Sequence, residues 1–313
     1  MLKYVLQRLA TFFPILFGIS IVVFLVLFLA PGDPAIIYLK NAGIPATEKS
    51  IAVVRNELGL DRPVFIQYAS WLKRAIRMDF GRSYVTDNPV LQEMVYYLPK
   101  TLVLSGGAFL LAIFVSFPLG ILSAIFKDRF PDNAARLLAF IGASVPNFWL
   151  GFLLMYLFAL RLGWLPAMGR GGVRHMILPM TTLSASLIAV LIRLIRNSML
   201  ENMNLRFVFY ARARGISEFR VITGHVVKIA FLPVITVLGM SFGHLVAGSV
   251  IVENVFAWPG ISRYAVTAIS ARDYPVVQCY LLMMAGGYIL VNLLVEIIHA
   301  GLDPRIRLNG EMR

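Results

Sequence analysis

The sequence has very few of the groups on which enzymes and disulfide-bonded proteins depend. It contains one cysteine, Cys279, which excludes an internal disulfide, and it has no CxxC pair or His/Cys cluster with metal-ligand spacing. No glycine is followed by lysine, so the GxxxxGK[ST] phosphate loop is absent, and so is the HExxH motif. If this chain takes part in ATP-driven work, the hydrolysis must occur on another subunit.

Acidic residues and charge in general are scarce as well. The chain has 29 Lys and Arg against 16 Asp and Glu, a net charge of +13, yet only 14% of its 313 residues are charged and 59% are hydrophobic. With a mean hydropathy of +0.78, it cannot cover a soluble globule of this size, so we expect it in a bilayer. The basic residues stand at the ends of apolar runs, where membrane topology places them, so no nucleic-acid partner is predicted.

Six apolar runs predict an all-α integral membrane protein with six transmembrane helices. They cover residues 9–30, 102–126, 137–160, 176–192, 229–252 and 276–302. The first run is too long for a cleaved signal peptide, so we expect it to remain as a spanning helix. Pro146 and Asn147 interrupt the third run and predict a kink, for which we favour a purely structural role over a functional one.

The distribution of basic residues predicts the orientation. Fifteen of the 29 Lys and Arg residues fall in the N-terminus, the 127–136 loop, the 193–228 loop and the tail, which we place inside. The two short outer loops hold five, and nine fall in residues 31–100, a segment long enough to cross despite its charge. Both termini are therefore predicted to be cytoplasmic.

The outer segment is predicted to contain two short helices. One is a capped helix at residues 47–58 that ends at Gly59, and the other is an amphipathic helix at residues 64–78. The apolar side of the second helix carries Phe65, Tyr68, Trp71, Leu72 and Ile76. This side could lie on the bilayer surface or pack against other outer helices, and the sequence leaves both open.

Residues 204–233, between the fourth and fifth runs, are dense in positive charge. The basic residues are Arg206, Arg212, Arg214, Arg220 and Lys228. Gly215 can end a helix in the left-handed conformation, and Ser217 before Glu218 can start another, so we predict a helix, a turn and a short helix. On the second helix, Phe219, Ile222 and Val226 form an apolar edge that a partner's groove could receive. On charge alone, a basic loop that only obeys topology rules is an equal alternative.

Ionisable side chains at membrane depth are candidate functional groups because each is costly to insert. His244, in the fifth run, is a candidate transient ligand for a divalent metal, although a hydrogen bond to a neighbouring helix is the commoner role. Glu296 and His299, three residues apart near the inner end of the sixth run, are explained by a local pair or by side chains that extend to the membrane interface.

The stretch from Glu253 to Gly260, ENVFAWPG, joins an acid and an amide to two large aromatic residues and a Pro-Gly turn. This combination suits an external loop that dips back over a pore mouth. Taken alone, Phe256 and Trp258 are better interpreted as an interfacial aromatic anchor.

Several motifs resemble one transporter family. YARARGIS, followed by His225 and Pro233, resembles the cytoplasmic coupling loop of permease subunits of binding-protein-dependent ABC importers, in the dipeptide, oligopeptide and nickel branch. Phe209 and Lys228 depart from the general loop motif, as the first-permease type of the branch does. PGDP after the first run, SVPNFW in the third, ENVFAWPGISRYAVTAISARDYPVVQ and the ending LDPRIR are also similar to this family.

The resemblance implies a type I ABC importer permease fold. It implies residues 1–30 as the N-terminal tail and first span, 31–100 as an external segment, 101–302 as the permease core with coupling loop 204–228, and 303–313 as a cytoplasmic tail. The implied partners are a second homologous permease, two ATPase subunits that bind ATP and Mg²⁺, a substrate-binding protein and the lipid bilayer. The chain itself would bind no cofactor and be no enzyme. The implied location is the plasma (inner) membrane of a bacterium or archaeon, with multiple passes.

The resemblance also implies two groups of site residues. The ATPase-coupling group is Tyr210, Ala211, Arg212, Ala213, Arg214, Gly215, Ser217, Glu218, Phe219 and Ile222. The candidates for the pore or external gate are His244, Glu253, Asn254, Phe256, Trp258 and Pro259, with His244 also the candidate metal ligand.

The substrate expected from the resemblance is nickel or a nickel chelate, with a dipeptide or oligopeptide as the alternative. WLPAMGRGGVRHMILP and FAWPGISRYAV…RDYPVVQCYLLMM, with Cys279 in the second stretch, look most like the nickel permease, although in this family the binding protein does most of the selecting. Two other classes are weaker: an intramembrane enzyme, for which no acid/base pair or metal motif is present, and a self-sufficient channel or carrier, which usually shows inverted repeats.

Overall fold

The computed structural model describes residues 2–302, and the side chains of residues 11–295. The described residues form two compact units: one joins residues 2–101 with Pro259–Leu293, and the other joins Leu102–Trp258 with residues 294–302. The predicted tail at 303–313 and the side chains of Glu296 and His299 lie outside this described part.

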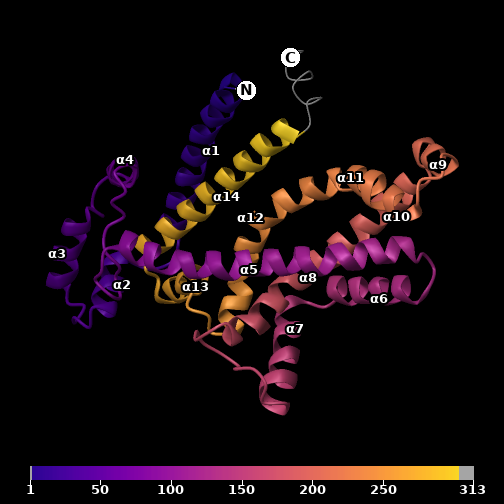
Figure 1. The fold of residues 1–313 in the computed structure, drawn as a ribbon. Helices are drawn as coiled ribbons and strands as arrows, with labels where there is room; N and C mark the ends of the chain where they lie inside the picture. Colours follow the sequence, from indigo (N-terminus) through magenta and orange to yellow (C-terminus); the bar gives the residue numbers. More distant parts are fainter. Residues whose placement is uncertain (1, 303–313) are drawn as a thin grey trace. The chain divides into compact units, whose positions relative to one another are not determined.

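The first unit carries the outer segment as short helices between longer ones. Its elements are α1 (Leu2–Phe28), α2 (Pro34–Asn41), α3 (Glu48–Leu58), α4 (Val64–Ile76), the start of α5 (Val90–Ile125), α13 (Ile261–Ala271) and most of α14 (Tyr274–Leu302) (Figure 1). Residues 2–302 contain no named strand, and Arg82 and Pro89 form an isolated bridge.

The capped helix predicted at residues 47–58 is confirmed as α3. The Thr47 hydroxyl accepts a hydrogen bond from the Ser50 amide at 3.2 Å, and the Ser50 hydroxyl accepts one from the Thr47 amide at 2.9 Å. This reciprocal pair satisfies amides that a helix start otherwise leaves open. Gly59 closes the helix with φ at +68°, as its position in the sequence predicts.

The apolar side of α4 is only partly buried. Tyr68 and Trp71 pack against Phe24 of α1, and the Tyr68 hydroxyl is hydrogen-bonded to Ser20 at 2.8 Å. The side chains of Phe65 and Ile76 are 71% and 74% exposed. The middle of the predicted apolar side therefore packs within the protein, whereas its two ends remain open.

Two polar contacts tie the outer segment to the chain between α13 and α14. Arg272, in the left-handed conformation after α13, donates to the carbonyl oxygen of Pro31 at 2.6 Å. The Ser83 hydroxyl donates to the buried carboxyl group of Asp273, whose pKa is raised by burial. Residues far apart in sequence are thus held together at the outer segment.

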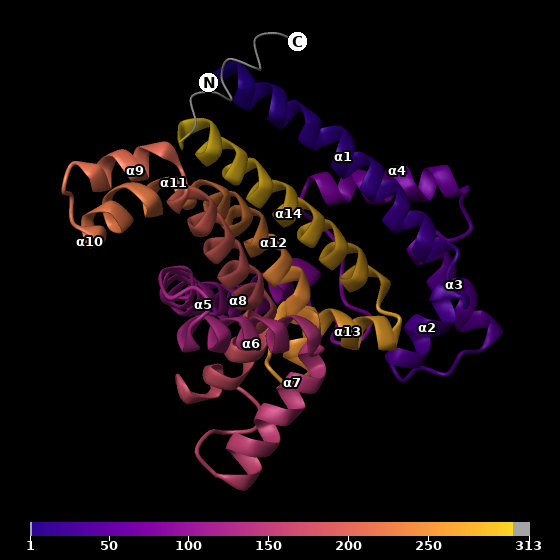
Figure 2. The same ribbon diagram turned by 90° about the vertical axis from the view of Figure 1, so that its right-hand side faces the viewer.

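The second unit is organised around one long helix, α8 (Arg174–Met203). Its other elements are the rest of α5, α6 (Phe130–Ser144), α7 (Asn147–Leu154), a π-helical segment η1 (Met155–Arg161), α9 (Arg206–Ala213), α10 (Glu218–Val221), a second π-helical segment η2 (Ile222–Val226), α11 (Val227–Ala230) and α12 (Leu232–Val255). Helices α6, α7, α11 and α12 all pack against α8, and Figures 1 and 2 both show α6 beside it. The core of the unit therefore follows α8.

The structure has five unbroken helices that could each cross a membrane, and a broken helix pair at the third predicted run. Helices α1, α5, α8, α12 and α14 are long and apolar enough to cross a membrane, and the described residues give six spans if α6 and the α7–η1 segment count as one. These two parts meet at Pro146 with a bend of 111°. The interruption predicted at Pro146 is confirmed, and the bend there is sharper than a kink, because the chain turns through more than a right angle.

Two helices also extend beyond their predicted limits. Helix α5 begins at Val90 and not at residue 102, so the last part of the predicted external segment, including Pro99, belongs to this helix. Helix α8 continues through Arg193 and Arg196 to Met203. Polar and basic residues led the sequence interpretation to start α5 too late and to end α8 too early, since hydropathy follows lipid contact and not helix length.

Candidate functional site

The basic segment forms a helical hairpin at one end of the second unit. Helix α9 ends at Ala213, Gly215 takes φ of +76°, and α10 starts at Glu218, which confirms the predicted helix, glycine turn and second helix. Figures 1 and 2 both show α9 and α10 beside each other at the margin of this unit. Ser217 occupies the predicted N-cap position, but its side chain makes no capping hydrogen bond.

An ion pair closes the hairpin across the glycine turn. The Arg212 guanidinium donates to both carboxylate oxygens of Glu218, at 2.9 Å from Nε to Oε2 and through a shorter contact from Nη2 to Oε1. This hydrogen bonding lowers the pKa of Glu218 below its ordinary value. The attraction is therefore fully present above the ordinary carboxyl pKa and is lost only as the pH falls through the lowered one.

The apolar edge predicted on the second helix is wrong in part. Ile222 is only 8% exposed and Val226 is fully buried, and both belong to the core of their own unit. Ala211, on α9, is buried in the same core. These side chains hold the hairpin in place and are covered by their own chain, so Ile222 is not a free contact for a partner.

Three aromatic side chains of the hairpin remain exposed. Phe219 is 76% exposed, and Phe209 and Tyr210 are also open, with their rings in edge contact at 6.3 Å between centroids. Ala213 and Arg214 lie on the same exposed part of the segment. Large apolar groups that no other part of the unit covers are typical of a surface that receives a partner.

The hairpin is connected firmly to α8. Val208, Val221 and Val226 are buried in the core that α8 shares. The hydroxyl of Ser198, on α8, donates to the carbonyl oxygen of Ala230 at 2.9 Å. The hairpin is therefore joined to α8 by packed side chains and a hydrogen bond as well as by the chain itself.

The sequence interpretation missed the π-helical segment η2, between α10 and α11. Such segments are rare and widen one turn of a helix, often at functional positions. Thr223 and Gly224 in ITGHV are weak helix formers, but they give no specific signal for a π-helix.

The stretch that starts at Glu253 is buried. Glu253 is fully buried near the end of α12, where Ser249 donates to its carboxylate at 3.2 Å. Phe256 and Trp258 are each about 1% exposed. The interpretation of these two aromatic residues as an interfacial anchor is therefore wrong, because the core of the second unit encloses both rings.

Neighbouring elements fix this aromatic pair closely. The Gly169 amide donates to the Phe256 carbonyl oxygen at 2.9 Å, and the Arg170 guanidinium lies 6.0 Å from the Trp258 ring. On α7, a Cβ added to Gly151 would come within 3.2 Å of the Phe256 ring. The close fit explains the glycine at this position.

The other predicted pore residues lie at different places. His244 is exposed on α12, and the Asn254 amide group donates to the Val250 carbonyl oxygen at 2.7 Å. Pro259 belongs to the first unit. Among the described residues, no three His, Cys, Asp or Glu side chains form a group that could hold a metal ion. The metal-ligand role of His244 remains a prediction.

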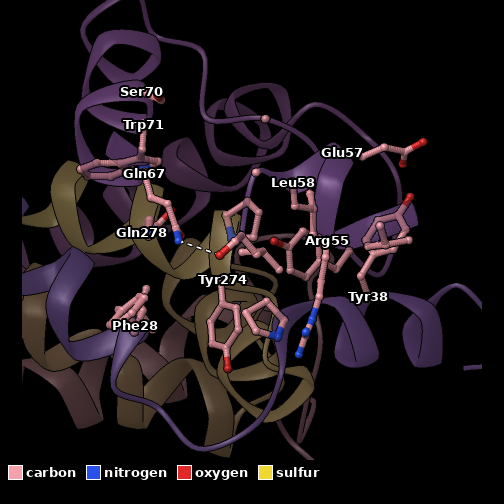
Figure 3. Close-up of a pocket in the computed structure, with 18 of the residues that line it drawn as sticks. Phe28, Tyr38, Arg55, Glu57, Leu58, Gln67, Ser70, Trp71, Tyr274 and Gln278 are labelled. Atoms are coloured by element: carbon pink, nitrogen blue, oxygen red, sulfur yellow. Dashed lines mark hydrogen bonds between the residues drawn. The ribbon is translucent and has the colours of Figure 1, made fainter. Parts of the chain in front are cut away.

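The first unit contains a pocket of about 960 Å³ that the sequence interpretation did not predict (Figure 3). The end of α1, the α3–α4 region and the start of α14 contribute to its walls. Figure 3 shows the rings of Phe28, Tyr38, Trp71 and Tyr274 around it. No local motif could reveal it, because its residues come from separate stretches of the chain.

The pocket carries charge of both signs. Arg55 donates to the Asp33 carboxylate at 2.5 and 3.1 Å, which neutralises that pair at one wall. Glu57 and Arg74 also belong to the lining. Gln67 donates to the carbonyl oxygen of Leu60 at 3.0 Å, which fixes its amide group. The pocket therefore offers aromatic surface together with groups for either a carboxylate or an ammonium ion.

Comparison with known families accounts for nearly the whole chain. Residues 116–308 match the model for the binding-protein-dependent transport system inner membrane component, and residues 1–105 match the model for the N-terminal part of such membrane components. The chain is 39% identical over 307 residues to the glutathione transport system permease protein GsiC of Salmonella typhi, and equally so to that of Escherichia coli. These alignments cover 98% of this chain and 99% of each relative.

Two solved structures share the fold. A crystal structure of an amino acid ABC transporter with histidines matches with a TM-score of 0.54 at 14% identity, over 67% of this chain and 94% of that one. A structure of the MetNI methionine ABC transporter in inward-facing conformations matches with a TM-score of 0.56 at 14% identity, over 68% and 97%. About two thirds of the chain therefore has the fold of these two transporter chains.

Proposed function

Because the chain belongs to the family of inner-membrane components of binding-protein-dependent transport systems, we propose that it forms half of the pore of an ATP-driven importer for short peptides. Members of this family are multi-pass permease subunits and not enzymes, and the ATPase activity lies with partner subunits. A second permease and a binding protein complete such importers in general.

The identity to glutathione permeases over 98% of the chain carries the peptide assignment. It favours the alternative of the sequence prediction over nickel, whose support was the likeness of two stretches, one of which contains Cys279. The Cys279 side chain is fully buried, so it is not open to a passing ion. The mixed charges of the pocket in the first unit are also compatible with the two charged ends of a short peptide.

The exposed aromatic residues of the α9–α10 hairpin support its role as the ATPase contact. An ATPase subunit that binds this hairpin differently in its two nucleotide states would shift the balance between two conformations of the permease, as any partner with unequal affinities does. The buried valines and Ser198 connect the hairpin to α8, so the shift would reach a membrane-spanning helix.

Uptake by cells with and without this chain, its partner subunits being present, tests the proposal. We expect the chain to be required for uptake of labelled glutathione or dipeptides, and we expect His244→Ala to leave that uptake unchanged. Phe219→Ser should reduce it at least about tenfold if the ring is an interface anchor. Phe65→Ser is the matched control, because this ring is similarly exposed in the other unit.

Two results would contradict the proposal. Uptake of Ni²⁺ that needs the chain, without any uptake of peptide, would restore the nickel prediction. Uptake of any substrate by the purified chain in vesicles without an ATPase would indicate a self-sufficient carrier.

A further inference from the structure

A polar groove of about 520 Å³ lies between α6 and α8 of the second unit, away from the hairpin aromatics and the Phe256–Trp258 pair. Residues at helical spacing on each helix form its walls. They are Asn133, Arg136, Leu137 and Phe140 on α6, and Arg193, Arg196 and Asn197 on α8. Each set lies along one face of its helix, so the groove follows the helix pair.

The two walls are held in fixed register. At one end, Arg196 donates to both oxygens of the buried Asp132 carboxylate, each at 2.7 Å. At the other end, α6 and α8 approach so closely that a Cβ on Gly142 would lie 2.9 Å from the Ala185 carbonyl oxygen. The helices therefore run antiparallel in close contact, and these contacts fix the shape of the groove between them.

The groove carries positive charge that the described part of the chain does not balance. Arg196 is committed to Asp132. Arg136 and Arg193 are exposed, and neither forms an ion pair or hydrogen bond with another described residue. Asn133 and Asn197, beside them, can donate further hydrogen bonds. These groups suit a phosphate, which accepts hydrogen bonds from several donors.

The same walls become apolar toward the middle of the helices. Leu137 and Phe140 on α6, and Val190 on α8, are exposed next to the basic residues. Both helices belong to segments with the length and composition of membrane spans. A ligand that fits the whole groove therefore has an anionic head and apolar chains, whereas a free phosphate ion would use only the basic end.

We propose that this groove binds one anionic phospholipid, with its phosphate between Arg136 and Arg193 and its acyl chains along Leu137 and Phe140. Basic pockets between membrane helices are a known physical basis for such recognition, because nearby arginines attract anionic headgroups. The bound lipid would hold α6 against α8 beside the Asp132–Arg196 ion pair.

The test uses the full chain in nanodiscs that contain phosphatidylcholine with a small fraction of phosphatidylglycerol. Native mass spectrometry measures which lipid is retained. We expect selective retention of phosphatidylglycerol, and a loss of selectivity of roughly fivefold per arginine in Arg136→Gln/Arg193→Gln. The matched control is Lys127→Gln/Arg129→Gln, which removes the same charge from the turn before α6, outside the groove, and should keep the selectivity.

Further measurements distinguish a bound lipid from a phosphate ion or a partner subunit in the groove. Phe140→Ser should weaken lipid retention, and millimolar inorganic phosphate should not displace the lipid. Displacement by phosphate with no effect of Phe140→Ser would overturn the proposal in favour of an ion site. Equal retention of both lipids, equal behaviour of the two double variants, or cross-linking of Asn197→Cys to a partner subunit in the assembled transporter would overturn it as well.

Discussion

At the residue scale, the hairpin depends on a glycine and an ion pair that act on the same turn. Gly215 supplies a left-handed conformation, and Arg212 and Glu218 meet across it. The ion pair is exposed and on its own contributes little stability. Its main effect is to fix how α10 leaves the turn, and hence where Phe219 is presented.

Gly215→Val is expected to abolish uptake while the amount of chain in the membrane stays normal. No other atom lies within 4 Å of the added Cβ, so the effect comes from the backbone alone, where the left-handed conformation costs a residue with a side chain about 1–2 kcal/mol. ATP hydrolysis and uptake in vesicles are the measurements. Gly215→Asn is the control, since asparagine tolerates this conformation and should retain most uptake. Normal uptake by the valine variant would contradict a coupling role for the turn.

Sequence predicted individual residues unevenly. Gly215 and Gly59 were predicted correctly, because a glycine next to a helix pattern is a local signal. Ile222, Phe256 and Trp258 were misjudged as open, because exposure depends on what packs against a side chain from elsewhere in the chain. Apolar spacing identifies a face but not its partner.

At the element scale, the close pairing of α6 with α8 and the sharp turn after α6 belong together. Gly142 and the buried ion pair hold α6 along α8, while the 111° bend at Pro146 sends α7 in another direction. Proline and asparagine in the sequence located the break correctly. Its size follows from tertiary packing, which the local pattern does not contain.

Asp132→Ala is expected to lower the free energy of unfolding by about 3–5 kcal/mol, because it leaves the Arg196 guanidinium without its partner in a mostly buried place. The double variant Asp132→Leu/Arg196→Met should recover most of this loss, since it removes both charges and keeps the volume. Thermal unfolding of the purified chain in one fixed lipid measures both. If the double variant is no more stable than the single one, the cost lies in packing and not in the unpaired charge.

At the scale of the whole molecule, composition and apolar runs were sufficient to predict that the chain is a membrane protein. The motifs were sufficient to predict its family. Hydropathy predicted the positions of all five unbroken candidate spans, although it did not predict where they end. The pocket of the first unit and the groove between α6 and α8 could not be predicted, because each joins residues that the sequence separates.

The predicted orientation can be tested with introduced cysteines. Cys279 is the single cysteine of the chain and is fully buried, so the unmodified chain should react little with a membrane-impermeant maleimide. Phe219→Cys is expected to react only in inside-out vesicles, and Phe65→Cys only in intact spheroplasts, because both positions are exposed on opposite sides of the predicted topology. Reaction of Phe219→Cys from outside would reverse the topology and remove the hairpin from any ATPase.

The length of α8 has a mechanical consequence. Thirty helical residues extend about 45 Å, whereas the hydrocarbon layer is about 30 Å thick. Roughly ten residues of α8 must therefore stand clear of the lipid tails or be taken up by tilt. The hairpin is attached to the C-terminal end of α8, so this helix can act as a lever arm. A small force applied at α9 and α10 would tilt the whole helix, and the elements packed along it would turn with it.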